Sequence, residues 1–86
     1  MLKNLLILGG TTEASSLAYL ISKTEFNATI SYAGRVKNIR QQPINTIIGG
    51  FGGVDGLSSY IISNEITHLV DATHPFAVQI LSLIHI

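Results

Sequence analysis

Short apolar runs alternate with amphipathic segments along this chain. The continuous apolar run at residues 4–8 stops at two glycines, a pattern typical of a strand that is buried on both faces of a sheet. Between residues 11 and 24, apolar side chains recur at the helical spacing i, i+3, i+4 and i+7. A helix with one buried stripe is therefore predicted there, and hydroxyl residues at its start can cap it. Three further strands are predicted, at residues 28–33, 44–48 and 67–72.

A second and a third helix complete the pattern. Apolar residues again share one face from Val54 to about Glu65. Pro75 suits the first turn of a helix, because a backbone N–H at that position would have no partner within the helix. Strands that alternate with helices over short connections predict a parallel sheet with helices on its faces. We therefore expect an α/β fold with a Rossmann-like parallel sheet, of about four strands and three helices.

The glycine-rich and polar segments of the chain follow the predicted strands. In a parallel α/β sheet, ligands bind in the crevice beyond the carboxyl ends of the strands. We therefore expect these segments to line one edge of the sheet. In chain order they are GGTTEA, AGR, GGFGG and DATHP.

The GGTTEA segment lies between a strand and a helix and is a variant of the dinucleotide-binding turn. Gly9 and Gly10 permit a sharp reversal and let a phosphate approach the backbone, where the helix supplies free N–H groups and the positive end of its dipole. The hydroxyls of Thr11 and Thr12 can add donors. Because the usual G-x-G-x-x-G is absent, a turn that only packs the helix against the sheet stays open as the alternative.

Arg35 follows the second predicted strand. An NAD site usually has an acidic residue in this region for the ribose diol, whereas an arginine accommodates the 2′-phosphate of NADP. No carboxylate occurs between Asn27 and Asn38, which favours NADPH as the cofactor and leaves NADH as the second choice. Alternatively, Arg35 is a solvated loop residue or binds an anionic substrate.

The GGFGG segment places four glycines around Phe51. Repeated glycine loses backbone entropy on folding, so close approach to a ligand is one physical reason for such a segment. An ordinary flexible loop is the alternative.

The DATHP segment ends the fourth predicted strand with a carboxylate, a hydroxyl and an imidazole. Asp71 can accept hydrogen bonds from nearby backbone, and Thr73 or His74 can cap the next helix. Alternatively, Thr73 and His74 face a cofactor or substrate, since a histidine can donate a proton near neutral pH. His68 and His85 lie in apolar surroundings and suit structural roles, and their spacing with His74 makes no recognisable metal site.

Composition narrows the classes of function. Five basic and five acidic residues leave no formal net charge. Because the sequence has no cluster of Lys and Arg, we do not expect it to bind nucleic acid. The absence of cysteine excludes thiolate metal sites and cysteine nucleophiles. The start of the chain lacks the apolar region of about 7–15 residues that a signal peptide needs, and no apolar stretch reaches the ~20 residues of a membrane span. We therefore expect a cytoplasmic protein.

Four segments also carry a family resemblance: LILGGTTEASSLA, SYAGRV, IGGFGGVDGLSSYI and LVDATHPFAVQI. In this order and spacing they closely resemble the amino-terminal half of the precorrin-6A reductases, enzymes of the corrin branch of cobalamin biosynthesis. The resemblance spans residues 4–80. Its most specific part is the pair GGFGG and DATHPFA.

The resemblance implies an oxidoreductase that delivers hydride from NADPH to the macrocycle of precorrin-6A, or of its cobalt-bearing counterpart, and gives precorrin-6B. The residues implied beside the nucleotide are Gly9, Gly10, Thr11, Glu13, Gly34 and Arg35. Those implied at the nicotinamide and the tetrapyrrole substrate are Gly50, Phe51, Gly52, Gly53, Thr73 and His74. Thr73 and His74 are the expected catalytic residues, with His74 as proton donor.

The family pattern implies two α/β domains, of which residues 1–80 are expected to form the amino-terminal, nucleotide-binding half. The second domain is expected to be missing, so the fragment alone is expected to be inactive. Charged residues make up 12% of the chain against a typical ~25%, which predicts apolar surface that self-associates. Residues 81–86, LSLIHI, resemble translated sequencing-adapter sequence and are expected to be an artefactual tail. A dinucleotide-binding regulatory module without catalysis stays the alternative function.

Overall fold

The computed structural model describes residues 3–32, 43–73 and 79–83 of the chain. In chain order its elements are β1 (Asn4–Leu8), α1 (Thr12–Ile21), β2 (Asn27–Tyr32), β3 (Asn45–Ile48), α2 (Gly53–Ser63), β4 (His68–Asp71) and β5 (Gln79–Ser82). The first four strands and the first two helices therefore lie where the hydrophobic pattern predicts them.

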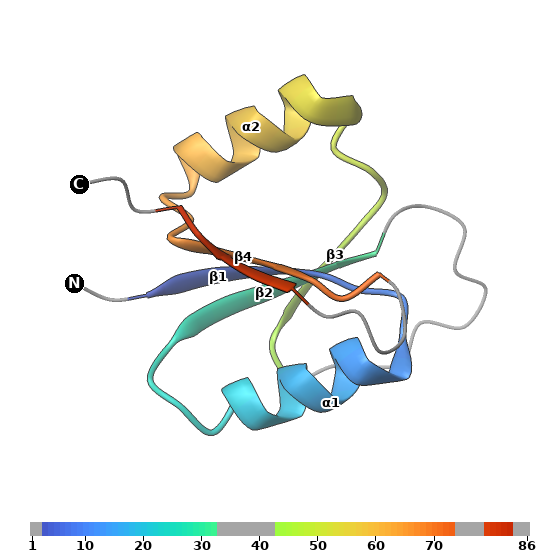
Figure 1. The fold of residues 1–86 in the computed structure, drawn as a ribbon, viewed down its shortest axis with the longest axis vertical. Helices are drawn as coiled ribbons and strands as arrows, with labels where there is room; N and C mark the ends of the chain where they lie inside the picture. The colour runs from blue at the N-terminus through green and yellow to red at the C-terminus, as the bar shows by residue number, and fades with distance from the viewer. Residues whose placement is uncertain (1–2, 33–42, 74–78, 84–86) are drawn as a thin grey trace.

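The strands form one sheet in the order β3-β2-β1-β4-β5, with β1 at its centre. The first four strands are parallel, and β5 alone runs antiparallel, beside β4. The two helices lie on opposite faces of this sheet (Figure 1). The predicted Rossmann-like α/β architecture is confirmed, and the carboxyl ends of the four parallel strands share one edge.

The end of the chain differs from the predicted third helix. Residues 79–82 form the strand β5, in which Gln79 pairs with Asp71 and Ile80 with Val70. Pairing explains the difference, because β5 satisfies backbone N–H and C=O groups along an edge of β4 that would otherwise stay open. Residues 75–78 of the expected helix lie outside the described residues.

The main core lies between the sheet and α1. Side chains alternate across a strand, so Leu5 and Ile7 of β1 point to the face that α1 covers. They pack with Ile30, Val70 and the small residue Ala18 of the helix, and all five are buried. Each large aliphatic side chain buried in this way stabilises the fold by about 1.5–3 kcal/mol.

The face of the sheet toward α2 is covered less closely. Leu6 of β1 points to that face and is fully buried. None of the α2 residues is buried, and Val54 and Ile62 are 80% and 76% exposed. Val54 was expected to belong to the apolar face of this helix, but it lies in the first turn and is open to solvent.

Thr11 fixes the start of α1. Its side-chain oxygen accepts a hydrogen bond from the N–H of Ala14 at 3.1 Å, so it acts as the N-cap that the hydroxyl-rich sequence predicts. In the described parts of the chain, neither helix is long and apolar enough to cross a membrane.

Candidate functional site

A cavity of about 240 Å³ lies at the carboxyl edge of the parallel sheet. It is lined by Leu8, Gly9, Ser31, Gly50, Phe51, Gly53, Leu57 and Thr73. The segments that follow β1, β3 and β4 therefore meet at one place, as the position of ligand sites in parallel α/β sheets predicts.

The cavity gathers five of the predicted site residues, which come from the segments that follow three strands: Gly9, Gly50, Phe51, Gly53 and Thr73. Four other predicted residues are described but do not line it: Gly10, Thr11, Glu13 and Gly52. The predicted residues Gly34, Arg35 and His74 lie outside the described residues. The geometry thus joins the GGFGG segment to Thr73 and to the first turn.

Gly9 brings the first turn against β2. Its N–H donates a 2.8 Å hydrogen bond to the carbonyl oxygen of Ser31. A Cβ at Gly9 would lie only 2.9 Å from Cγ1 of Ile30 and 3.3 Å from that same carbonyl oxygen. Gly9 therefore has a packing role, because a side chain there would not fit against β2. Gly9 is also one of the residues that line the cavity.

The Thr11 hydroxyl was expected to offer a donor to a phosphate, and the structure directs it elsewhere. Oγ1 of Thr11 donates to the carbonyl oxygen of Ala72 at 2.7 Å while it accepts from Ala14. The hydroxyl hydrogen is therefore used inside the protein, and any contribution to anion binding would come from the backbone at the start of α1. Gly10, just before it, is exposed and has a φ of +120°.

The Phe51 loop is held against α2. The rings of Phe51 and Tyr60 have centroids 5.0 Å apart and planes tilted by 55°, a favourable edge-type arrangement. Gly52 is the N-cap of α2 with a φ of +82°, a conformation that suits glycine. Phe51 can thus present part of its ring to the cavity from a fixed position.

Gly56 was not among the predicted site residues, although it supports one of them. A Cβ on Gly56 would overlap the carbonyl oxygen of Phe51. Only a glycine lets the loop fold this closely onto the helix. The dipeptide Asp55-Gly56 inside a helical pattern was the available signal, because an isolated helical glycine often has a packing reason.

Asp71 and Thr73 form a local pair at the end of β4. Oδ1 of Asp71 accepts both the N–H of Thr73, at 3.1 Å, and its hydroxyl, at 2.7 Å. Asp71 is half-buried and Thr73 is exposed. The expectation that Asp71 accepts hydrogen bonds from its neighbours is confirmed, and the carboxylate also fixes the hydroxyl of Thr73.

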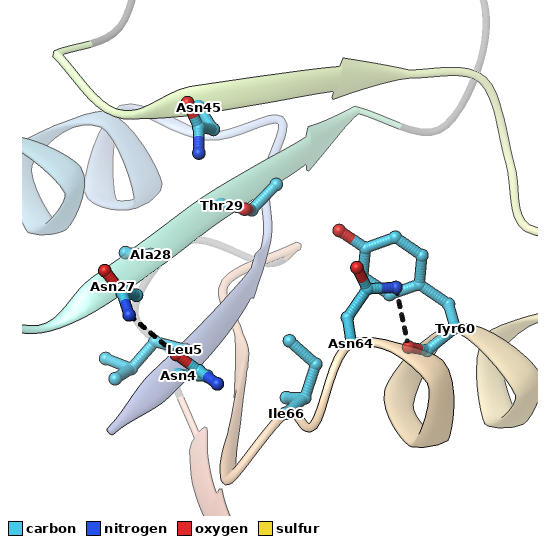
Figure 2. Close-up of a pocket in the computed structure, with 9 residues that line it drawn as sticks. All are labelled: Asn4, Leu5, Asn27, Ala28, Thr29, Asn45, Tyr60, Asn64 and Ile66. Carbon is cyan, nitrogen blue, oxygen red and sulfur yellow. Dashed lines mark hydrogen bonds between the residues drawn. The ribbon is translucent and has the colours of Figure 1, made fainter. Parts of the chain in front are cut away.

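A second pocket, of about 190 Å³, lies at the amino edge of the sheet beside the end of α2 (Figure 2). Four asparagines line it, and three of them, Asn4, Asn27 and Asn64, form side-chain hydrogen bonds with one another or with the backbone. Nδ2 of Asn27 donates to Oδ1 of Asn4 at 3.1 Å, and Nδ2 of Asn64 donates to the Tyr60 carbonyl at 3.0 Å. None of the predicted site residues lines this pocket, so the carboxyl edge is the candidate site.

Within the described ranges, no group of three or more His, Cys, Asp or Glu residues is placed to hold a metal ion. The cavity at the carboxyl edge is instead lined by apolar residues and glycines together with Ser31 and Thr73. Such walls suit a largely uncharged organic group that is oriented by a few hydrogen bonds.

Comparison with protein families gives a match over residues 4–85 to the family described as precorrin-6x reductase CbiJ/CobK. The chain is 55% identical over 75 residues to a precorrin-6A reductase of Rhodobacter capsulatus, and 52% identical over 77 residues to one of Sinorhizobium sp.. These matches cover 87% and 88% of this chain but only 30% of each relative.

A solved structure of a CobK precorrin-6A reductase has the same fold. It superposes with a TM-score of 0.81 at 52% sequence identity, over 87% of this chain and 30% of that one. The chain therefore spans about 30% of the length of the curated relatives it matches.

Proposed function

Because the chain belongs to the precorrin-6x reductase family CbiJ/CobK, we propose that it provides the cofactor-binding part of an NADPH-dependent precorrin-6A reductase. The observation that carries this proposal is the cavity at the carboxyl edge, where Gly9, the GGFGG segment and Thr73 converge. Ligands of parallel α/β sheets bind at this edge.

The residues at this edge fit a dinucleotide. The start of α1 supports the phosphates, since Gly10 is exposed and helical N–H groups follow it. Leu8, Phe51 and Leu57 give the cavity apolar walls for an uncharged ring. Gly34 and Arg35 are proposed to hold the ribose 2′-phosphate, which favours NADPH over NADH.

The proposed reaction adds hydride to the macrocycle of precorrin-6A or of its cobalt-bearing counterpart, an oxidoreduction at a CH–CH group. When bound, the dihydronicotinamide supplies the hydride, and the protein binds and orients the reactants. Phe51 and Thr73 are proposed to bound the place where the two meet, with His74 as the proton donor. Most of the relatives' length lies beyond the matched segment, and it is proposed to supply the other wall of the cleft.

Binding of NADPH by the 86-residue chain tests the cofactor part of this proposal. The chain has no tryptophan, so nicotinamide fluorescence can be followed without energy transfer from indole. We expect NADPH to bind saturably and to raise the midpoint of thermal unfolding, because a ligand of the native state alone stabilises it. Absence of both effects would contradict the proposal.

Catalysis requires a longer protein. Residues 4–80 would replace the matching segment of the Rhodobacter capsulatus precorrin-6A reductase, to which this chain is 55% identical. The chimera is expected to oxidise NADPH when precorrin-6A is added, with the parental enzyme as control. A folded chimera that binds NADPH but never reduces precorrin-6A would instead support a dinucleotide sensor.

A further inference from the structure

The Asp71–Thr73 pair reaches the cavity through one side chain only. Thr73 lines the cavity, whereas Asp71 is not among the lining residues. The two are joined by the 2.7 Å bond from the Thr73 hydroxyl to Oδ1 of Asp71 and by the 3.1 Å bond from the Thr73 N–H. Asp71 therefore acts on a ligand here through the hydroxyl of Thr73.

The direction of the hydroxyl bond decides what Thr73 offers. A threonine hydroxyl has one hydrogen and two acceptor lone pairs. Its hydrogen points at the carboxylate of Asp71, so Oγ1 has only lone pairs left to offer a ligand. The side chain of Thr73 can thus accept a hydrogen bond from a ligand, but it has no hydrogen to donate.

The same arrangement disfavours negative charge. A phosphate or carboxylate next to Oγ1 of Thr73 would meet oxygen lone pairs instead of a hydrogen-bond donor. The walls contributed by Leu8, Phe51 and Leu57 are apolar. A flat, uncharged heterocycle that carries an N–H donor fits both the walls and the acceptor.

We propose that Asp71 is a positioning residue that fixes Thr73 as the acceptor for an exocyclic N–H₂ group of the cofactor. This inference rests on the proposed function. In the proposed function this group is the carboxamide of the dihydronicotinamide; the amino group of adenine is the alternative that the test below separates from it. The phosphates and the 2′-phosphate carry no N–H donor and so do not match this acceptor.

The test measures the affinity of the 86-residue chain for three cofactors by titration calorimetry. They are NADPH, its 3-acetylpyridine analogue, which lacks the carboxamide N–H₂, and its hypoxanthine analogue, which lacks the adenine amino group. One analogue is expected to bind about two- to tenfold more weakly than NADPH, the ratio that a single net hydrogen bond produces. The analogue that loses affinity identifies the group at Thr73.

Variants of Thr73 connect this discrimination to the hydroxyl. Thr73→Val is expected to weaken NADPH about two- to tenfold and to bind the affected analogue as well as NADPH. Thr73→Ser keeps the hydroxyl and is expected to restore the discrimination. Thr46→Val is the matched control, because Thr46 lies on β3, does not line the cavity and donates only to the Ile44 carbonyl.

Asp71→Ala tests the positioning role. It removes the acceptor of both Thr73 bonds and lets the hydroxyl hydrogen turn toward a ligand, so discrimination is expected to disappear although Thr73 is intact. Asp71→Asn keeps an oxygen that can accept both bonds and is expected to retain the discrimination. A merely structural role of Asp71 would weaken all three cofactors by the same factor. If Asp71→Ala does not fold, Asp71→Asn decides, because a loss of discrimination in a variant that keeps the acceptor oxygen would contradict the positioning role.

Different results would overturn the inference about Asp71 and Thr73 and the proposed function. Discrimination that persists in Thr73→Val, or equal binding of all three cofactors by the unmodified chain, overturns the inference and leaves NADPH binding standing. If the unmodified chain binds no NADPH, both are overturned.

Discussion

Gly56 shows how one missing side chain shapes the candidate site. It lies under the carbonyl of Phe51, and a Cβ there would overlap the oxygen. Gly56→Ala removes a glycine from a helix, which by itself favours the helix by up to about 1 kcal/mol. The overlap forces the Phe51 loop to move, and such overpacking costs about 1–3 kcal/mol. We therefore expect a net loss of stability together with weaker NADPH binding.

Urea unfolding followed by circular dichroism measures the stability change. Ser59→Ala is the matched control, because Ser59 is an exposed residue of the same helix and such changes usually stay within about 0.5 kcal/mol. If the Gly56→Ala and Ser59→Ala chains had the same free energy of unfolding, the Phe51 loop would be able to move away from the new Cβ without loss of stability.

At the scale of elements, Thr11 joins the start of α1 to the end of β4. Its hydroxyl caps Ala14 and also donates to the carbonyl of Ala72. Thr11→Val loses both bonds and is expected to lower the free energy of unfolding by about 1–2 kcal/mol. Thr11→Ser retains the hydroxyl and is expected to lose far less. Equal unfolding midpoints for the two variants in urea would contradict this role.

The elements also show where sequence patterns suffice. The strands β1 to β4 were predicted to within one residue, because each is a short apolar run bounded by turn residues. β5 was missed, since QILS has no strand pattern of its own and Pro75 suggested a helix. Only its pairing with β4 makes it a strand, and pairing between distant segments is not readable from local spacing.

Part of the candidate site could likewise be predicted from the sequence, and part could not. The shared carboxyl edge of parallel strands was enough to predict that Gly9, Phe51 and Thr73 converge. The overlap between Gly56 and Phe51 depends on how the loop folds onto α2, and the bond from Thr11 to Ala72 depends on how α1 sits against β4. Such distances arise from tertiary packing rather than from residue spacing.

At the scale of the whole molecule, much apolar surface is open to solvent. Large hydrophobic residues that are at least half exposed occur on α1, β3, α2 and β5: Tyr19, Leu20, Ile48, Val54, Ile62, Ile80 and Leu81. Where such residues form a contiguous patch, the patch usually marks a contact with another protein. We therefore expect the isolated chain to self-associate, with a mass in light scattering that rises with concentration.

A charge on the antiparallel strand should oppose this association. Leu81 is 50% exposed on β5, at one end of the strand order, and a lysine at a sheet edge discourages pairing between chains. Leu81→Lys is expected to shift the mass toward that of the monomer. A monodisperse monomer for the unmodified chain at high concentration would refute the prediction.

The central place of β1 has a consequence for synthesis. One of its neighbours, β2, begins at Asn27 and is connected to β1 by α1. The other neighbour, β4, begins only at His68. A nascent chain can form the first pair early and must then wait for the second. Until residue 71 has left the ribosome, one edge of β1, the most apolar strand of the protein, has no strand to pair with. A stalled or cleaved chain would therefore expose unpaired backbone groups with which strands of other chains can pair.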